Sequence, residues 1–262
     1  MSTDTAGFYD DLAEHYHLIF EDWGRSVQRQ AGTLGPLLEN KLVRGPLKIL
    51  DCACGIGTQA LGLAQRGHTV VATDLSKAAV KRAAREASSL GLNIEFHVAD
   101  MRDLSALPAS EFDAVMAGDN SLPHLLSDED LGRALENISA RLRPGGVLLA
   151  TIRDYDSLLP TRPSFQGPTF YSENETRRFV HQVWDWDGNQ YDVHLYLTWN
   201  TASVWTSKHY ASRYRAITRA ELTQSLASHG FREIEWLMPE TTTFYQPIVL
   251  ARKEDNSAVK LT

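Results

Sequence analysis

The chain has 262 residues, of which 43% are hydrophobic and 23% are charged, as in an ordinary globular protein. Its longest apolar runs span only a few residues, as at Val147–Ala150, and a membrane helix needs about 20. The formal net charge is −7, and no run of Lys or Arg exceeds two residues. This composition excludes the basic surface of a nucleic-acid-binding protein and favours a small-molecule partner, with neither a nucleic acid nor a membrane as a partner.

The beginning of the chain and its cysteines indicate a reducing compartment. The first 17 residues are acidic and lack the basic and apolar regions of a secretory signal. The two cysteines, Cys52 and Cys54, have C-x-C spacing rather than a redox or zinc pattern, so we interpret them as small buried residues. The histidines show no H-x-x-x-H or H-E-x-x-H spacing, so no metal site is expected. We expect a cytoplasmic protein.

Strand-like and helix-like segments alternate between residues 47 and 150. The predicted strands are Leu47–Cys52, Thr69–Thr73, Ile94–Val98, Asp113–Ala117 and Val147–Ile152. The predicted helices between them are Thr58–Arg66, Ser76–Leu90 and Asp128–Leu142. Repeated β-α-β units with apolar strands predict an α/β fold, a Rossmann-like, doubly wound and mainly parallel sheet covered by helices.

Cap and turn residues mark the ends of two predicted helices. Ser127 and Asp130 have the spacing of a capping box, and Pro144-Gly145-Gly146 is expected to end the helix that they start. Thr218 and Glu221 form a second such pair, at the start of a helix that ends near His229.

The pattern changes after the fifth strand. Residues 153–217 favour strands, with a hairpin turn at Asp187-Gly188, and we predict an antiparallel insertion that covers the sheet. Two more strand-like runs, at residues 232–238 and 246–253, finish the chain. The length favours a single domain, residues 1–262, with this insertion inside it.

The residues 49–60, ILDCACGIGTQA, form a glycine turn between a strand and a helix. The glycines let the backbone approach a ligand at the carboxyl edge of the sheet, and the helix start offers unpaired N–H groups. The string also fits G-x-G-x-x-A, so an NAD-dependent oxidoreductase stays a remote alternative.

Three strand ends favour S-adenosylmethionine over a dinucleotide. Asp51 suits an ammonium group better than a pyrophosphate, and Asp74 suits two ribose hydroxyls. Asp100 with Met101 suits an adenine amino group and ring face.

These residues, together with the RPGG turn, resemble class I S-adenosylmethionine-dependent methyltransferases over about residues 45–152. The motifs GDNSLPHL at 118–125, IRDYDSLL at 152–159, FY at 170–171 and SKHYASRY at 207–214 are similar to glycine and sarcosine N-methyltransferases. The resemblance implies methyl transfer to a nitrogen of a small amino-acid-like acceptor, with S-adenosyl-L-homocysteine as the second product.

The resemblance also implies roles for individual residues. Residues 1–44 form a helical cap over the cofactor, and residues 153–217 cover the acceptor. The implied cofactor-binding residues are Tyr9, Tyr16, Arg25, Ala53, Cys54, Gly55, Gly57, Asp74, Leu75, Asp100, Met101, Gly118, Asp119, Ser121 and His124. The implied acceptor-positioning residues are Asn120, Arg153, Tyr171, Tyr196 and Tyr214, with the Arg153 guanidinium binding a carboxylate.

Some features leave the identity of the acceptor undecided. Trp184, Trp186, Trp199 and Trp205 are more aromatic than a glycine pocket needs, so a nitrogen heterocycle of secondary metabolism, such as a toxoflavin-type azapteridine, is the alternative acceptor. Displacement at a methyl group needs positioning more than a catalytic triad. A base, if one is used, is solvent, a tyrosine, His124 or His194. A cofactor-binding protein without turnover and a homo-oligomer are also left open.

Overall fold

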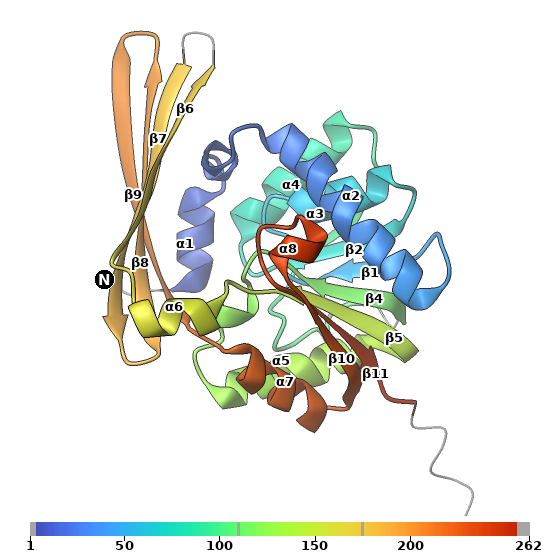
Figure 1. Cartoon of the computed structure of the whole chain (residues 1–262). Helices are drawn as coiled ribbons and strands as arrows, with labels where there is room; N and C mark the ends of the chain where they lie inside the picture. Colours follow the sequence, from blue (N-terminus) through green and yellow to red (C-terminus); the bar gives the residue numbers. More distant parts are fainter. Residues whose placement is uncertain (1–3, 109–110, 174–175, 256–262) are drawn as a thin grey trace, which may run out of the picture.

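The computed structural model describes residues 4–108, 111–173 and 176–255. In these residues, a central sheet of seven strands has the order β10-β11-β5-β4-β1-β2-β3 (Figure 1). The strands are β1 Lys48–Asp51, β2 Thr69–Asp74, β3 Glu95–Val98, β4 Phe112–Ala117, β5 Leu142–Thr151, β10 Phe231–Leu237 and β11 Ile248–Lys253. The first five are parallel, and β11 runs antiparallel to both β5 and β10.

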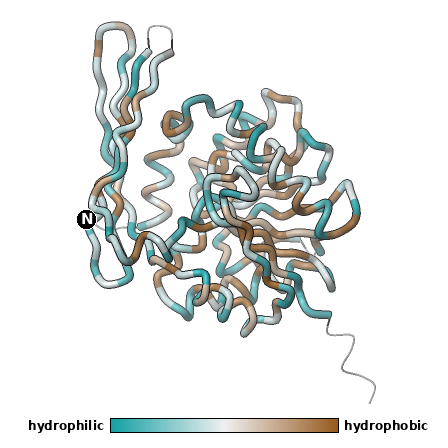
Figure 2. The backbone as a smooth tube through the Cα atoms, viewed as in Figure 1, coloured by the Kyte–Doolittle hydropathy of each residue, from teal (hydrophilic) through white to brown (hydrophobic). Residues whose placement is uncertain are grey.

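Helices cover both faces of this sheet. On one face lie α2 Trp23–Leu42, α3 Thr58–Gln65 and α4 Lys77–Ser89, and on the other lie α5 Asp128–Arg141 and α7 Arg219–Ser228 (Figure 1). Successive strand residues belong to different cores: Leu50 and Leu148 pack toward α5 and α7, whereas Ile49 and Leu149 pack toward α2 and α3. The strands are therefore apolar on both faces, and Figure 2 shows the hydrophobic segments gathered there.

A second, antiparallel sheet stands beside the first. It follows α6 Tyr155–Thr161 and has the order β6-β7-β8-β9, with β6 Phe165–Glu173, β7 Thr176–Asp187, β8 Gln190–Thr201 and β9 Val204–Arg215. One end of its long hairpins extends beyond the rest of the molecule (Figure 1). Its inner face carries alternate residues of β8, among them Tyr191, Val193 and Leu195, which are buried.

The first two helices of the N-terminal segment, within residues 5–19, lie between the two sheets. α1 Thr5–Leu12 and the short helix η1 Tyr16–Ile19 pass along the inner face of the antiparallel sheet (Figure 1). Phe8 and Leu12 pack there against Leu195, Leu197 and Tyr210. Two short helices, η2 Leu122–His124 and α8 Pro239–Thr242, complete the elements described.

The predicted fold class is confirmed, with three differences of detail. Residues 153–217 were expected to favour strands, but Tyr155–Thr161 in this range form the helix α6. The strand expected from Val147 already begins at Leu142, and Pro144-Gly145-Gly146 lie inside β5 rather than behind a helix. The register between β4 and β5 shifts there, and Gly145 has a φ of 69°, so the three residues form an irregularity in the strand. The hairpin turn is at Gly188-Asn189, one residue later than predicted, because Asp187 still pairs with Gln190.

Both predicted helix starts are confirmed, but only the capping box at Thr218 is complete. The Ser127 hydroxyl accepts the Asp130 N–H at 3.1 Å, and Thr218 with Glu221 forms the reciprocal capping box of α7. Within the described residues, no helix is both long enough and apolar enough to span a membrane.

Candidate functional site

The loop between β1 and α3 places backbone groups at the carboxyl edge of the sheet. Gly55 and Gly57 have φ values of 52° and 95°, which favour glycine. A Cβ on Gly57 would lie 3.2 Å from both the Ala83 Cβ and the Leu61 Cγ, so this glycine permits the close packing of α3 and α4. The backbone N–H groups of Cys52 and Cys54 bond to Met116 and Thr73 and hold the loop against two strand ends.

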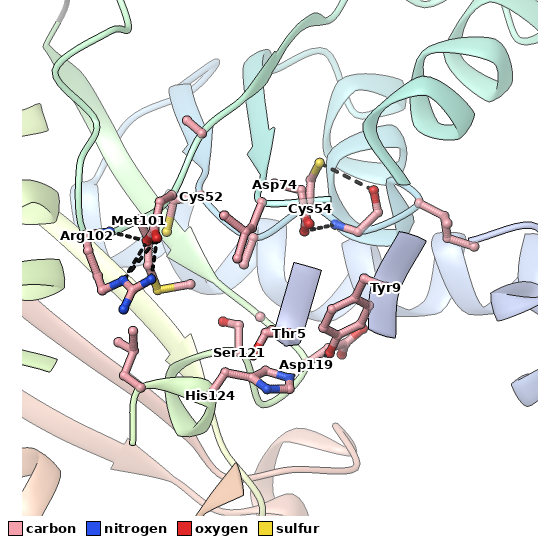
Figure 3. A pocket seen from close by; sticks show the side chains of 18 of the residues that line it. Thr5, Tyr9, Cys52, Cys54, Asp74, Met101, Arg102, Asp119, Ser121 and His124 are labelled. Atoms are coloured by element: carbon pink, nitrogen blue, oxygen red, sulfur yellow. Dashed lines mark hydrogen bonds and ion pairs between the residues drawn. The ribbon is translucent and has the colours of Figure 1, made fainter. Parts of the chain in front are cut away.

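A cavity of about 300 Å³ opens beside this loop. It lies where β1, β2, β3 and β4 end, and Figure 3 shows Met101 and Arg102 toward one end and Tyr9, Ser121 and His124 toward the other. We call it the first cavity. The predicted cofactor residues that line it are Tyr9, Tyr16, Ala53, Cys54, Gly55, Asp74, Leu75, Asp100, Met101, Gly118, Asp119, Ser121 and His124.

Asp74 connects the glycine loop to α4. One carboxylate oxygen accepts the Gly55 N–H at 2.8 Å and the other accepts the Ser76 N–H at 2.8 Å. Burial raises the pKa of Asp74, and these hydrogen bonds oppose the rise. Since a carboxylate oxygen accepts more than one hydrogen bond, both can still accept a donor from the cavity.

Asp100 has a partner that the sequence analysis missed. Arg102 lines the first cavity, donates to both Asp100 oxygens at 2.6 to 3.1 Å, and pairs with Asp130 at 3.1 Å. Partial burial would raise the pKa of Asp100, but the Arg102 hydrogen bonds bring it below its usual value. Asp100 therefore stays ionised, and its orientation is fixed before any ligand arrives.

His124 and Tyr9 join η2 to α1. The Tyr9 hydroxyl lies 2.9 Å from His124 Nε2, and the imidazole packs on the Tyr214 ring at 4.1 Å. Burial lowers the pKa of His124 to about 3. The imidazole is neutral at physiological pH and accepts a proton poorly there. His194, the other histidine considered as a base, lines neither cavity and contacts His209 at 2.9 Å.

A second cavity of about 1050 Å³ lies between the N-terminal segment and the inner face of the antiparallel sheet. Asn120, Arg153, Tyr171 and Tyr214 line it, as expected for acceptor residues. Tyr9, Tyr16 and Asp119 line both cavities and form their common wall.

Arg153 is a partly buried cation without a carboxylate partner. It donates to the Tyr191 hydroxyl at 2.7 Å and to Gln182 at 3.3 Å, and it lies over the Trp184 ring at 4.8 Å. In the described part of the chain, no acidic side chain lies within ion-pair distance of its guanidinium. Neighbouring Asp154 and Asp156 pair with Arg219 instead. The second cavity therefore offers an uncompensated positive charge.

Asn120 offers a second free donor beside Arg153. Its Oδ1 accepts the Arg153 backbone N–H at 2.9 Å and the Tyr155 hydroxyl at 3.0 Å, which fixes the amide orientation. The residue is only 3% exposed, and its Nδ2 is buried without a protein partner. A buried donor of this kind indicates a ligand acceptor in the adjoining cavity.

Three of the predicted residues lie elsewhere. Tyr196 is on the outer face of the antiparallel sheet, stacked on His181 at 4.9 Å, because alternate residues of β8 point to opposite faces. Gly57 packs between helices and does not line the first cavity. Arg25 lines only the second cavity, where its exposed side chain pairs with Asp22 at 3.2 Å.

The N-terminal segment divides between two roles. α1 and η1 supply Tyr9 and Tyr16 to the cavities, whereas α2 packs on the central sheet through Leu34 and Leu38. Tyr245, which lines the second cavity and donates to the Asp119 carboxylate, was also missed by the sequence analysis.

Part of the chain is similar to known methyltransferases. Residues 49–146 match a family model described as a methyltransferase domain. The chain is 30% identical over 152 residues to a glycine/sarcosine N-methyltransferase of Parasynechococcus marenigrum, covering 58% of this chain and 52% of the relative. It is 32% identical over 144 residues to the dTDP-3-amino-3,6-dideoxy-alpha-D-glucopyranose N,N-dimethyltransferase of Streptomyces fradiae, covering 55% and 54%. The chain thus spans about half the length of these curated relatives.

Solved structures show the same fold. The sugar N-methyltransferase of a Streptoalloteichus species superimposes with a TM-score of 0.75 at 18% identity, over 93% of this chain and 94% of that one. The likeness includes both sheets, because it extends over nearly the whole chain.

Proposed function

Because residues 49–146 match a methyltransferase domain, we propose that the chain transfers a methyl group from S-adenosylmethionine to a nitrogen of a small molecule. The first cavity binds the cofactor and the second binds the acceptor. The cofactor would supply an electrophilic methyl group. The lone pair of the acceptor nitrogen would attack the methyl carbon in line as the thioether leaves with the bonding electron pair. The protein holds the acceptor in place and excludes water from the region where the two cavities meet.

The first cavity has groups that suit this cofactor. Asp74 accepts hydrogen bonds from the ribose hydroxyls, and Met101 with Asp100 faces the adenine. Ala53, Cys54 and Gly55 line the methionine part, near the buried Asp51 carboxylate, of which Oδ2 has no protein partner. The Ser121 hydroxyl, also buried and unpartnered, provides a further hydrogen-bonding group.

The acceptor carries a carboxylate next to its nitrogen, as glycine and sarcosine do. The observation that supports this proposal is the Arg153 guanidinium, which lines the second cavity and has no carboxylate partner. The unpartnered Nδ2 of Asn120 lies beside it. A planar guanidinium and an amide N–H together match the two oxygens of a carboxylate.

A calorimetric titration tests the proposal. We expect S-adenosylhomocysteine to bind, and glycine or sarcosine to bind to the loaded protein. In Arg153→Leu the affinity for these amino acids should fall at least about tenfold, as for the loss of a charged hydrogen bond. Arg25→Leu, which removes an exposed arginine of the same cavity, should change it little. Equal affinities in the Arg153→Leu variant and the unmutated protein would contradict the carboxylate site.

The size of the second cavity favours a second candidate acceptor. A cavity of about 1050 Å³, walled by Trp184, Tyr171 and Tyr214, exceeds what glycine fills. A nitrogen heterocycle, or an amino sugar like that named for the Streptomyces fradiae relative, suits this space. Adding nitrogen heterocycles and amino sugars to the same titration separates these acceptors. A dinucleotide that binds the folded state would raise the melting temperature. Since the proposed cofactor is not a dinucleotide, we expect excess NAD to leave the melting temperature unchanged.

A further inference from the structure

We infer that Asp119 binds the amino group of the acceptor and takes up its proton before methyl transfer. This inference rests on the proposed function, since it assumes that the second cavity holds the acceptor. It assigns Asp119 a role toward the acceptor, whereas the resemblance implied one toward the cofactor.

The position of Asp119 supports this role. It lies two residues after the end of β4, in the common wall of the two cavities, where an acceptor nitrogen must meet the methyl group. The next residue, Asn120, lines the second cavity beside Arg153. The chain therefore brings a carboxylate and two donors to one stretch of the cavity wall.

The backbone at this point is strained. Asp119 and Asn120 have φ values of 52° and 65°, so two successive residues other than glycine adopt the left-handed region. Such backbone conformations persist at sites where a side chain must be presented in one orientation.

The charges around Asp119 leave room for a cation. Its carboxylate accepts a hydrogen bond from the Tyr245 hydroxyl, and Gln59 is its other hydrogen-bonding neighbour. Among the residues that the structure describes, no Lys or Arg forms an ion pair with it, and both hydrogen-bonding neighbours are uncharged side chains. Tyr16 and the Asp51 carboxylate also interact electrostatically with Asp119, and Arg29 with Tyr245.

The two uncompensated charges complement a zwitterion. Asp119 and Arg153 both line the second cavity, and Asn120, the residue after Asp119, accepts the Arg153 backbone N–H at 2.9 Å. An amino acid then binds with its carboxylate at Arg153 and Asn120 and with its ammonium at Asp119. This orientation directs the nitrogen toward the first cavity.

In this proposal, proton transfer to Asp119 precedes methyl transfer. The Asp119 carboxylate accepts one proton from the acceptor ammonium, which exposes the nitrogen lone pair. The nitrogen–carbon bond forms as the carbon–sulfur bond breaks, and the bonding pair stays on sulfur. The methylated ammonium leaves, and Asp119 returns its proton to solvent. Burial raises the pKa of Asp119 and the Tyr245 hydrogen bond opposes the rise, so its basicity is closer to that of an amine than usual.

Fragment binding tests the inference without knowledge of the natural acceptor. Protein loaded with S-adenosylhomocysteine is titrated with ethylammonium, acetate and glycine by calorimetry. In Asp119→Asn we expect ethylammonium affinity to fall at least about tenfold, while acetate and S-adenosylhomocysteine affinities change less than about threefold. Asp154→Asn is the matched control, because its carboxylate lines the same cavity but already pairs with Arg219.

The outcomes separate this inference from the proposed function. Absence of ethylammonium binding to the unmutated protein, or equal binding to Asp119→Asn, overturns the role of Asp119. A selective loss of S-adenosylhomocysteine affinity also overturns it and returns the residue to the cofactor site. If ethylammonium binding depends on Asp119 but acetate does not bind, the inference stands and the carboxylate site at Arg153 fails.

A pH series provides a readout that a structural role would not change. Ethylammonium binding requires the ionised carboxylate, so it should be lost as the pH falls through the pKa of Asp119. Tyr245→Phe removes a donor that stabilises the carboxylate, so in this variant the loss should occur at higher pH. An unchanged pH profile in Tyr245→Phe overturns the inference even if Asp119→Asn fails to fold.

Discussion

Asp51 is buried at the end of β1, and one of its carboxylate oxygens has no partner. An ionised Asp51 therefore lowers the stability of the folded protein. Burial raises the pKa of Asp51 to about 8, from about 4 in an unfolded chain. The folded protein therefore keeps a proton that the unfolded chain releases between about pH 4 and pH 8, so this group's contribution to stability falls as the pH rises through that range.

We expect Asp51→Asn to stabilise the free protein increasingly as the pH rises. The gain in melting temperature over the unmutated protein should be small at pH 5 and reach several degrees at pH 8, because the variant has no carboxylate to ionise. Asp103→Asn is a suitable control, since its exposed carboxylate has a lowered pKa and stays ionised across this range. A melting temperature difference that is the same at both pH values would show that Asp51 carries no extra proton.

Asp74 should matter for the cofactor rather than for the acceptor. In Asp74→Asn one carbonyl oxygen remains to accept a backbone N–H, but the charged acceptors for the ribose hydroxyls are lost. We expect the affinity for S-adenosylhomocysteine to fall about 10- to 100-fold, the range for hydrogen bonds to a charged group. Calorimetry measures this, and normal affinity in the variant would exclude Asp74 from the cofactor site.

Individual residues were predictable where a local pattern carried the information. Asp74 and Met101 were expected at a ligand site because ligands bind at the strand ends of a β-α-β unit, and both line the first cavity, Asp74 at the end of β2 and Met101 three residues after β3. Tyr196 was misplaced although the alternation that turns Tyr191 and Leu195 inward already turns it outward. Tyr245 lies 126 residues from Asp119, and no local pattern connects the two.

At the scale of elements, α1 depends on partners distant in sequence. Leu12 is 1% exposed and packs against Leu195 and Tyr210 of the antiparallel sheet. We expect Leu12→Ala to leave a cavity that costs about 2–5 kcal/mol in packing and to loosen α1. Because α1 carries Tyr9, S-adenosylhomocysteine should then dissociate faster in stopped-flow measurements.

Leu90→Ala provides the control for this experiment, because Leu90 is 50% exposed at the end of α4. Its substitution should change neither the melting temperature nor the dissociation rate appreciably. If Leu12→Ala lowers the melting temperature without changing dissociation, α1 does not retain the cofactor.

Elements with apolar periodicity and caps were predictable, and irregular ones were not. Ser127 and Thr218 marked two helix starts because the cap chemistry is local. The strand β5 begins before Pro144-Gly145-Gly146 because pairing with β4 extends it across residues that usually interrupt strands. That pairing is a property of the sheet, which no single segment encodes.

At the scale of the whole molecule, the two sheets differ in how well they are covered. The strands β1 and β4 are buried on both faces, whereas residues 204–209 of β9 are exposed. We expect amide hydrogen exchange to be slow in β1 and β4 and orders of magnitude faster around residues 201–206. Mass spectrometry of exchanged peptides measures this, and equal protection in both regions would mean that the exposed hairpin end is covered in solution.

The attachment of the N-terminal segment affects the order in which the molecule is completed. Arg178 of β7 donates to the backbone carbonyls of Leu18, Phe20 and Glu21, about 160 residues earlier in the chain. During synthesis, the segment that supplies Tyr9 and Tyr16 leaves the ribosome before β7 to β9 and has no docking surface until these strands have emerged. The wall between the two cavities therefore forms only after the antiparallel sheet has been synthesised, so the nascent chain has no complete binding site before that point.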